Sequence, residues 1–452
     1  MKRALVILCT LCGVASAHVG SPDVFFDGDA GPYELFVTVR MPKVIPGVAQ
    51  VEIRSSSTDV ASIDVQPLRL AGPGSERPPT ADHAERASSD PQFFTASLWL
   101  MERGSMQVRV TAHGARGDGV LGVPVPAIAQ TTLGMTPGLG GVLLVLMLVL
   151  AVSLVAIVVG AKREATLAPG EPARPRGRIA IVVVSAMVVG AIVLGRMWWT
   201  SVATDYAQLV YKPWPVEPKL DGCALSITTP DAYAVLPDHG HDMHLFLVRM
   251  PALDRMAHLH PERTAHTFTE QLPSLPAGHY KVYADVVLRS GFPLTGTAEL
   301  DLPELHCGAP RGDDTVWSSG DPSHVVWDRP ASLRAGVAMP LAFHVEPADG
   351  LEPYMGMVAH AEVIKTDGSV FAHLHPSGSV AMPALELAQS SMSGTTMDMP
   401  MTMPMQMKMP PITPKFSIPF GFPRAGDYRV FVQIKRNGAI ETASFDAHVD
   451  SP

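Results

Sequence analysis

The sequence predicts a mainly β protein with three Ig-like or cupredoxin-like β-sandwich domains and two transmembrane α-helices. Three apolar stretches raise the hydrophobic fraction of the 452-residue chain to 47%, while the charged fraction is only 17%. The rest of the chain is rich in Pro (42) and Gly (38) and contains few segments with helical periodicity. This pattern is typical of short strands joined by turns, and the length requires more than one domain.

The first apolar stretch has the three parts of a secretory signal peptide. Lys2 and Arg3 are basic, Ala4 to Val14 is apolar, and Ala15-Ser16-Ala17 is an A-x-A cleavage site. We therefore expect residues 1–17 to be removed and the chain to be exported.

Cleavage after Ala17 would make His18 the first residue of the mature chain. An N-terminal histidine offers its α-amine and its imidazole to one ion, a chelate that suits Cu(II). The alternative is that His18 has no such role, since only His83 and His113 are available as further histidines before the membrane. The sequence leaves both interpretations open.

The other two apolar stretches, residues 139–160 and 179–199, are long enough to span a bilayer of about 30 Å. Trp198 and Trp199 would lie at the membrane interface. The loop 161–178 has more basic than acidic residues: Lys162, Arg163, Arg174, Arg176 and Arg178 against Glu164 and Glu171. The positive-inside rule then makes the loop cytoplasmic. We expect a bacterial inner-membrane protein with both β-rich regions on the periplasmic side.

Residues 18–130 are expected to form the first β-sandwich. Tyr33 to Arg40 and Ser105 to Thr111 alternate apolar and polar side chains, as a strand with one buried face does. Phe93 to Met101 is a third candidate strand. A small antiparallel sandwich is the predicted result.

The region after the second helix contains an internal repeat, which predicts two Ig-like domains at 219–308 and 321–450. Each copy has a histidine that opens an apolar strand, then the motif A-H-L-H-P, then a Gly-x-Tyr strand. The motif is Ala257 to Pro261 in the first copy, and it recurs as Ala372 to Pro376 in the second.

Cys223 and Cys307 are the only cysteines of the expected mature chain, since Cys9 and Cys12 lie in the signal peptide. An exported protein can form a disulfide between them. The alternative is that both act as thiolate metal ligands.

The repeated histidines are candidate metal ligands, because residues i and i+2 of a strand point to the same face. His258 and His260 would lie side by side, with His244 on the preceding strand as a third imidazole. The second copy offers the same set: His360, His373 and His375. Imidazole suits copper and zinc. The segment 238–244, Asp-His-Gly-His-Asp-Met-His, adds further ligands. A polar core network is the alternative interpretation.

A methionine-rich loop at 392–409 is a second candidate site. Thioethers are soft ligands that favour Cu(I), and several prolines argue against a regular strand here. The loop begins with Met392, and its alternating methionines are Met397, Met399, Met401, Met403, Met405, Met407 and Met409.

The repeat resembles bacterial envelope proteins with YtkA-like or FixH-like β-sandwich modules. The resemblance lies in Met243 to Phe246, Ala257 to Pro261 and Pro276 to Tyr280, and the second copy departs from it at Ala359 to Glu362. It covers about 220–450 and implies a role in copper handling or respiratory-complex assembly.

The order of segments is also similar to that of the copper-bearing B subunit of particulate methane monooxygenase. That subunit has its H-x-H motif in the first β-domain, where this sequence has none. Of the copper-site features of that subunit, only the N-terminal histidine has a counterpart in this sequence, His18.

These patterns favour a non-enzymatic, membrane-anchored periplasmic protein that binds copper, as Cu(I) or Cu(II), for handling, resistance or delivery. Its partners would be a copper donor or acceptor, or another envelope protein. The chain has no G-x-S-x-G, H-E-x-x-H or P-loop motif. Its net charge is −9 and it has no basic block, so we expect no nucleic acid. The alternatives are a metal-free envelope assembly protein and a subunit of a multi-chain copper oxidase.

Overall fold

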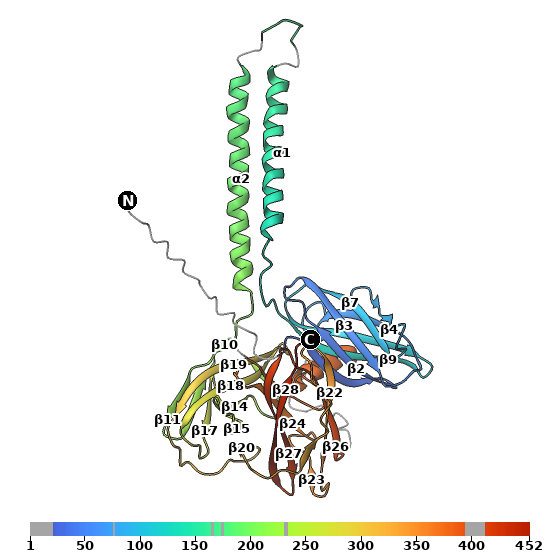
Figure 1. Cartoon of the computed structure of the whole chain (residues 1–452), viewed down its shortest axis with the longest axis vertical. Helices are drawn as coiled ribbons and strands as arrows, with labels where there is room; N and C mark the ends of the chain where they lie inside the picture. The colour runs from blue at the N-terminus through green and yellow to red at the C-terminus, as the bar shows by residue number, and fades with distance from the viewer. Residues whose placement is uncertain (1–20, 76, 164–166, 173–175, 230–233, 394–411) are drawn as a thin grey trace. The chain divides into compact units, whose positions relative to one another are not determined.

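The computed structural model describes residues 21–75, 77–163, 167–172, 176–229, 234–393 and 412–452. The described residues form a mainly β protein, and its helices are two long apolar ones and one short one (Figure 1). Contacts divide the chain into two units, residues 129–211 and all the rest. His18 and the methionines from Met397 to Met409 lie outside the described residues, so these expectations stay predictions.

The N-terminal β-domain consists of two antiparallel sheets that share one core. The first sheet has the order β1 (Val24–Ala30), β2 (Tyr33–Arg40), β3 (Gly47–Ser55), β7 (Phe93–Leu100), β6 (Glu85–Arg86). The second has the order β5 (Asp82–His83), β4 (Val60–Arg69), β8 (Gly104–Gly114), β9 (Gly117–Ala127). Strand β3 shows why the sequence folds this way, since every second residue from Gly47 to Ser55 is buried.

The first repeat forms a module of two sheets, which we call the first module (214–318). The larger sheet has the order β10 (Trp214–Pro215), β19 (Pro293–Leu302), β18 (Gly278–Leu288), β14 (His244–Arg249), β15 (Arg255–Leu259), β20 (Thr315–Ser318), with β13 (Val235–Leu236) paired to β18. The smaller has the order β11 (Pro218–Asp221), β12 (Ala224–Thr228), β17 (Thr267–Gln271), β16 (Glu262–Thr264). Strands β10 and β20 lie outside the range 219–308 expected for this module.

The second repeat forms the second module (325–449), again from two sheets. One has the order β21 (Val325–Trp327), β22 (Ala338–Val345), β26 (Lys415–Gly421). The other has the order β23 (Leu351–Glu352), β27 (Gly426–Arg436), β24 (His360–Lys365), β25 (Phe371–Leu374), with β28 (Ala439–Val449) paired to β27. A helix that the sequence analysis did not predict, α3 (Met382–Ser393), follows β25 and buries Ala384, Leu385 and Ala388 in the core of the N-terminal domain.

Cys223 and Cys307 form a disulfide in the first module, with their Cα atoms 5.9 Å apart. This confirms the disulfide over the thiolate alternative. In the chain-entropy model, closing a loop between cysteines 84 positions apart stabilises the fold by about 4–5 kcal/mol.

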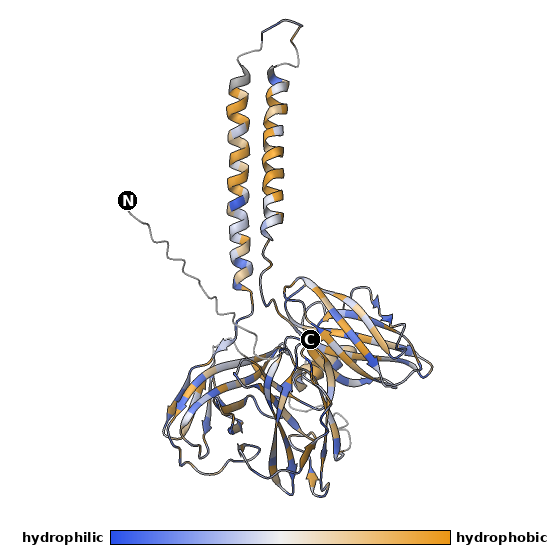
Figure 2. Ribbon diagram, viewed as in Figure 1, coloured by the Kyte–Doolittle hydropathy of each residue, from blue (hydrophilic) through white to orange (hydrophobic). Residues whose placement is uncertain are grey.

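The second unit is a pair of helices, α1 (Pro137–Arg163) and α2 (Arg176–Gln208). Both are long and apolar enough to cross a membrane, and Figure 2 shows apolar residues along most of their length. Helix α2 continues to Gln208, although we expected the span to end at residue 199. The hydroxyls of Thr200 and Thr204 donate to carbonyls four residues earlier, so both polar side chains find their hydrogen-bond partners within the helix.

The two modules pack through the sheets that carry the repeated histidines. Phe246, Met256 and Trp317 of the first module form one apolar cluster with Phe371 and Phe431 of the second. Side chains of each module also donate hydrogen bonds to backbone carbonyls of the other. The Tyr283 hydroxyl donates to the carbonyl of Gly368 at 3.2 Å, and the Arg429 guanidinium donates to the carbonyl of Leu253 at 3.1 Å.

Candidate metal centre

Strand register places three histidines of the first module on one sheet face. Strands β14 and β15 are antiparallel, with Leu245 opposite Leu259 and Phe246 opposite His258. Extending this register by one pair sets His244 opposite His260. Directly opposite residues of an antiparallel pair point to the same side, and so do residues i and i+2. The imidazoles of His244, His258 and His260 therefore converge, as the sequence predicted.

The second module repeats this arrangement. Strands β24 and β25 pair Ala361 with Leu374 and Glu362 with His373, so the same extension sets His360 opposite His375. The rings of His373 and His375 lie 4.8 Å apart between centroids. Because this face is turned toward the first module, the two sets of histidines meet at the interface.

The first histidine group is His244, His258 and His260, one ring nitrogen from each lying within 4.8 Å of the others. All three side chains are buried. His244 Nδ1 and His258 Nε2 are 3.0 Å apart. Two nitrogens bound at 2.0–2.1 Å to one tetrahedral ion are about 3.3–3.4 Å apart, so this pair needs a shift of only a few tenths of an ångström.

The outer ring nitrogens of this group each face an oxygen atom. His244 Nε2 lies 3.2 Å from the carbonyl oxygen of Asp238, and His260 Nδ1 lies 2.9 Å from Asp314 Oδ1. His258 Nδ1 lies 2.7 Å from Gln433 Oε1, and the Gln433 amide nitrogen donates to Thr442. An oxygen acceptor on the outer nitrogen fixes the ring proton there, as it does for metal-ligating histidines.

The inner nitrogens of the first group then carry lone pairs. With the ring protons on the outer nitrogens, His244 Nδ1 and His258 Nε2 turn lone pairs toward each other at 3.0 Å, a repulsion that a cation between them would relieve. His260 Nε2 is buried and has no hydrogen-bond partner among the described residues. Three converging lone pairs in a buried position have the donor chemistry of a copper or zinc site.

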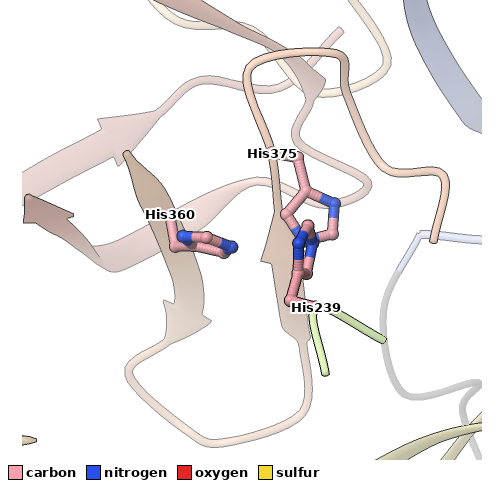
Figure 3. A group of neighbouring side chains, drawn as sticks. All are labelled: His239, His360 and His375. Atoms are coloured by element: carbon pink, nitrogen blue, oxygen red, sulfur yellow. The ribbon is translucent and has the colours of Figure 1, made fainter. Parts of the chain in front are cut away.

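The second histidine group draws on both modules: His239, His360 and His375. His239 comes from the turn Asp238–His241 of the first module, where its backbone has a φ of +52°. His239 Nε2 and His375 Nε2 are 3.3 Å apart, and Figure 3 shows the His360 ring directed toward this pair. The three converging histidines here are not the expected set of His360, His373 and His375: His239 takes the place of His373, since the turn reaches across the interface.

His373 and His241 lie beside the two groups. The His373 ring centroid is 5.0 Å from that of His244 and 5.8 Å from that of His360, so it lies between the groups. His241 stacks on His260 at 3.9 Å, and its side chain is 29% exposed. It is therefore the histidine of this cluster that is most open to solvent.

The modules exchange polar partners across the interface. Asp285 pairs with His244 on the neighbouring strand, and Gln433 pairs with His360 at the matching place in the second module. Gln433 bonds His258 of the first module, while Asp285 Oδ2 lies 3.4 Å from His373 Nδ1 of the second. Each module thus places an oxygen acceptor on the H-x-H motif of the other, as in a pseudo-twofold dimer.

Burial keeps these imidazoles neutral. It lowers the pKa of His244, His258 and His360 well below 6.5, and the neighbouring imidazoles act in the same direction. It lowers the pKa to about 3 for His239, His373 and His375. Metal ions compete with protons for imidazole, so the lowered pKa values of these six rings favour metal binding over addition of a second proton.

Three carboxyl groups surround the cluster: Asp238 and Glu362 are buried, and Asp285 is partly exposed. Burial raises the pKa of Asp238 and of Asp285 to about 6, and that of Glu362 well above 4.5. Both Glu362 oxygens lack a partner among the described residues, and Oε1 lies 3.9 Å from His258 Nδ1. This contact is too long for a hydrogen bond, and burial disfavours the charged form of both groups. A nearby cation would favour the carboxylate form.

Gln433, Asp314, Asp285 and Glu362 were not predicted from the sequence. Alignment of the two repeats could have indicated Glu362, because this charged residue stands where the first copy has Phe246. No sequence pattern indicates Gln433 or Asp285, since their role depends on how the modules face each other.

A sequence-family profile described as a domain of unknown function (DUF8832) matches residues 318–451. No curated protein sequence matches the chain. Among solved structures, the D1–D4 ectodomain fragment of ICAM-5 is similar at 11% identity, over 90% of this chain and 74% of that one, with a TM-score of 0.15.

Chicken CNTN1 FN1–FN3 domains match at 9% identity over 91% of this chain and 97% of that one, with a TM-score of 0.13. Salmonella alpha-2-macroglobulin matches at 10% identity over 96% of this chain and 24% of that one, with a TM-score of 0.20. These scores are too low to support an argument. The description of the fold rests on the sheets themselves.

Proposed function

We propose that the chain is a membrane-anchored copper-binding protein on the periplasmic face of the bacterial inner membrane, with His244, His258 and His260 as ligands. One observation carries the proposal. The outer nitrogens of these rings face oxygen acceptors, so their inner nitrogens converge as unprotonated lone pairs.

Copper fits the donor set better than other common metals do. Neutral imidazole suits copper and zinc, and copper binds more tightly to a given nitrogen site. The disulfide between Cys223 and Cys307 is consistent with an oxidising compartment outside the cytoplasm. The methionine-rich segment adds soft thioethers to the same chain, which favours Cu(I) capture or transfer.

A metal-free assembly protein explains the cluster less well. A polar network built only for packing would pair its buried nitrogens, because each unsatisfied polar group costs about 1–3 kcal/mol. Among the described residues, His260 Nε2 and both ring nitrogens of His360 have no partner. A bound metal would supply a partner for His260 Nε2 and for one of the two nitrogens of His360.

The test measures copper retained by the purified full-length protein in detergent. The protein is loaded with copper, dialysed against copper-free buffer and analysed for metal per chain. We expect copper to be retained at micromolar protein, and the double substitution His258→Ala and His260→Ala to remove at least one ion per chain.

The matched control is the pair His83→Ala and His113→Ala, two histidines that share Asp64 on the N-terminal domain. It should retain as much copper as the wild type. A folded wild-type protein that keeps no copper, or a His258/His260 variant that keeps all of it, would refute the proposal. Zinc loaded in parallel shows whether the site prefers copper.

A further inference from the structure

We infer that the second histidine group is a second copper position, shared by both modules, so that the ion bound there holds the modules together. The inference rests on the proposed function for the choice of metal. It concerns a different set of residues: His239 of the first module with His360 and His375 of the second.

The spacing of this group already fits a metal ion. The 3.3 Å between His239 Nε2 and His375 Nε2 matches the separation of two nitrogen ligands on a tetrahedral ion. His375 Nδ1 lies 3.3 Å from the carbonyl oxygen of Val380, so its ring proton is held on the outer side. The inner Nε2 of His375 is thereby left as a lone pair.

His360 supplies an independent observation. Its side chain is fully buried, yet neither ring nitrogen has a partner among the described residues. The ring centroid lies 4.9 Å from that of His239 and 5.1 Å from that of His375, and the ring is directed at both (Figure 3). An imidazole that is buried, unpaired and aimed at two others has the place of a third ligand.

The two histidine groups differ in what they require of the fold. All three members of the first group belong to one module, so they stay together when the modules separate, and only the Gln433 acceptor of His258 is lost. The second group exists only while the modules are docked, because His239 reaches across the interface. An ion bound only by the docked state stabilises docking in proportion to its affinity, so copper at this position favours the closed arrangement.

The loop that carries His375 is also fixed from outside its own module. Ser379 N donates to the carbonyl of Phe25 at 2.9 Å, and Asp27 N donates to the carbonyl of Ser377 at the same distance. Strand β1 of the N-terminal domain thus restrains the segment just after His375. The second group is therefore assembled by three parts of the chain.

The test compares copper stoichiometry in the wild type and four variants of the full-length protein in detergent. The protein is loaded with Cu(II), which thioethers bind less readily than Cu(I). We expect two copper ions per chain in the wild type, one in His260→Ala and one in His239→Asn. Asparagine tolerates the left-handed backbone of this turn, so His239→Asn removes the imidazole and keeps the turn. His360→Gln is a second variant from the other module, and His279→Asn, on an exposed histidine of the first module, is the control.

Hydrogen exchange of the peptides that contain β14 and β24 is the second readout. Copper should slow exchange in both strands in the wild type and in His260→Ala, but much less in His239→Asn. The inference would be overturned if the wild type bound one ion per chain and this ion were lost in His260→Ala but kept in both His239→Asn and His360→Gln. That result would leave the proposed function intact. No copper in any version would overturn both.

Discussion

Acid should weaken the packing of the two modules in the metal-free protein, and His373 is the residue to test. It is buried and its pKa is lowered to about 3 by burial and by His260. It belongs to neither three-histidine group, so replacing it leaves both groups in place. We expect His373→Gln to resist acid better than the wild type.

The sign follows from the direction of the pKa shift. The unfolded chain binds a proton at His373 below pH 6.5, while the folded chain does not until about pH 3. Stability is therefore unaffected above pH 6.5 and falls as the pH drops through this window. At pH 5 the cost is 1.5 pH units at 1.36 kcal/mol each, or about 2 kcal/mol.

The assay is native-state hydrogen exchange of the β14, β24 and β25 peptides in full-length protein with a chelator present. The free energy of opening is measured at pH 7 and pH 5 for the wild type and for His373→Gln. The variant loses packing contacts at both pH values, so the informative quantity is how the difference in opening free energy between wild type and variant changes with pH. From pH 7 to pH 5 this difference should shift by about 2 kcal/mol in favour of the variant.

His448→Gln is the control, because its pKa is raised by the hydrogen bond to Asp427. The charged form of that hydrogen bond stabilises the fold below pH 6.5, and this stabilisation is lost as the pH rises through the raised pKa of the folded state. Lowering the pH from 7 to 5 should therefore favour the wild type over His448→Gln, opposite to the effect expected for His373→Gln. A difference between wild type and His373→Gln that stays constant from pH 7 to pH 5 would refute the reasoning.

Three further changes test the surroundings of the site. Gln433→Leu removes the acceptor of His258 Nδ1. We expect denaturation to show a loss of about 1–3 kcal/mol in stability. Competition with a chelator should show roughly 10–100-fold weaker copper binding. Asp314→Asn weakens the acceptor of His260 Nδ1 and should lower copper affinity about tenfold with unchanged thermal unfolding of the metal-free protein. Cys223→Ser with Cys307→Ser should cost the first module about 4–5 kcal/mol in denaturant unfolding and leave copper stoichiometry unchanged. A folded Gln433→Leu protein with wild-type copper affinity would contradict the assignment of His258 as a ligand.

The sequence predicted those elements whose pattern is local. Strand β2 has the range expected from its alternation, Tyr33 to Arg40, and both long helices contain their apolar runs. Helix α3 was missed because it has only 12 residues, and its apolar side chains are buried by another domain. The polar end of α2 was missed because the length of an apolar run predicts only the membrane-spanning part of a helix. It does not predict that the helix continues through Thr200 and Thr204.

The first histidine group was predictable because it needs only strand geometry. His258 and His260 are two residues apart, and His244 opens the adjacent strand, so one register brings them together. The second group was not predictable in this way. Its composition depends on which faces of the modules meet, and no local pattern distinguishes His239, which crosses the interface, from His373, which does not become part of the triplet.

Duplication explains how one local arrangement yields two unlike sites. In the first module Phe246 stacks on His258 at 4.3 Å and forms an apolar wall. Glu362 occupies the matching position in the second module and brings a buried carboxyl group to within 3.9 Å of the same His258. A cation in the first group would thus have an ionisable neighbour supplied by the other module.

The turns differ in the same way. Asp238–His241 and Tyr354–Met357 close with the same bridge, and His239 and Met355 both have positive φ. The imidazole of one turn and the thioether of the other therefore occupy matching backbone positions. Imidazole suits copper and zinc whereas thioether is a soft donor, so duplication has left donors of different type at equivalent places in the two turns.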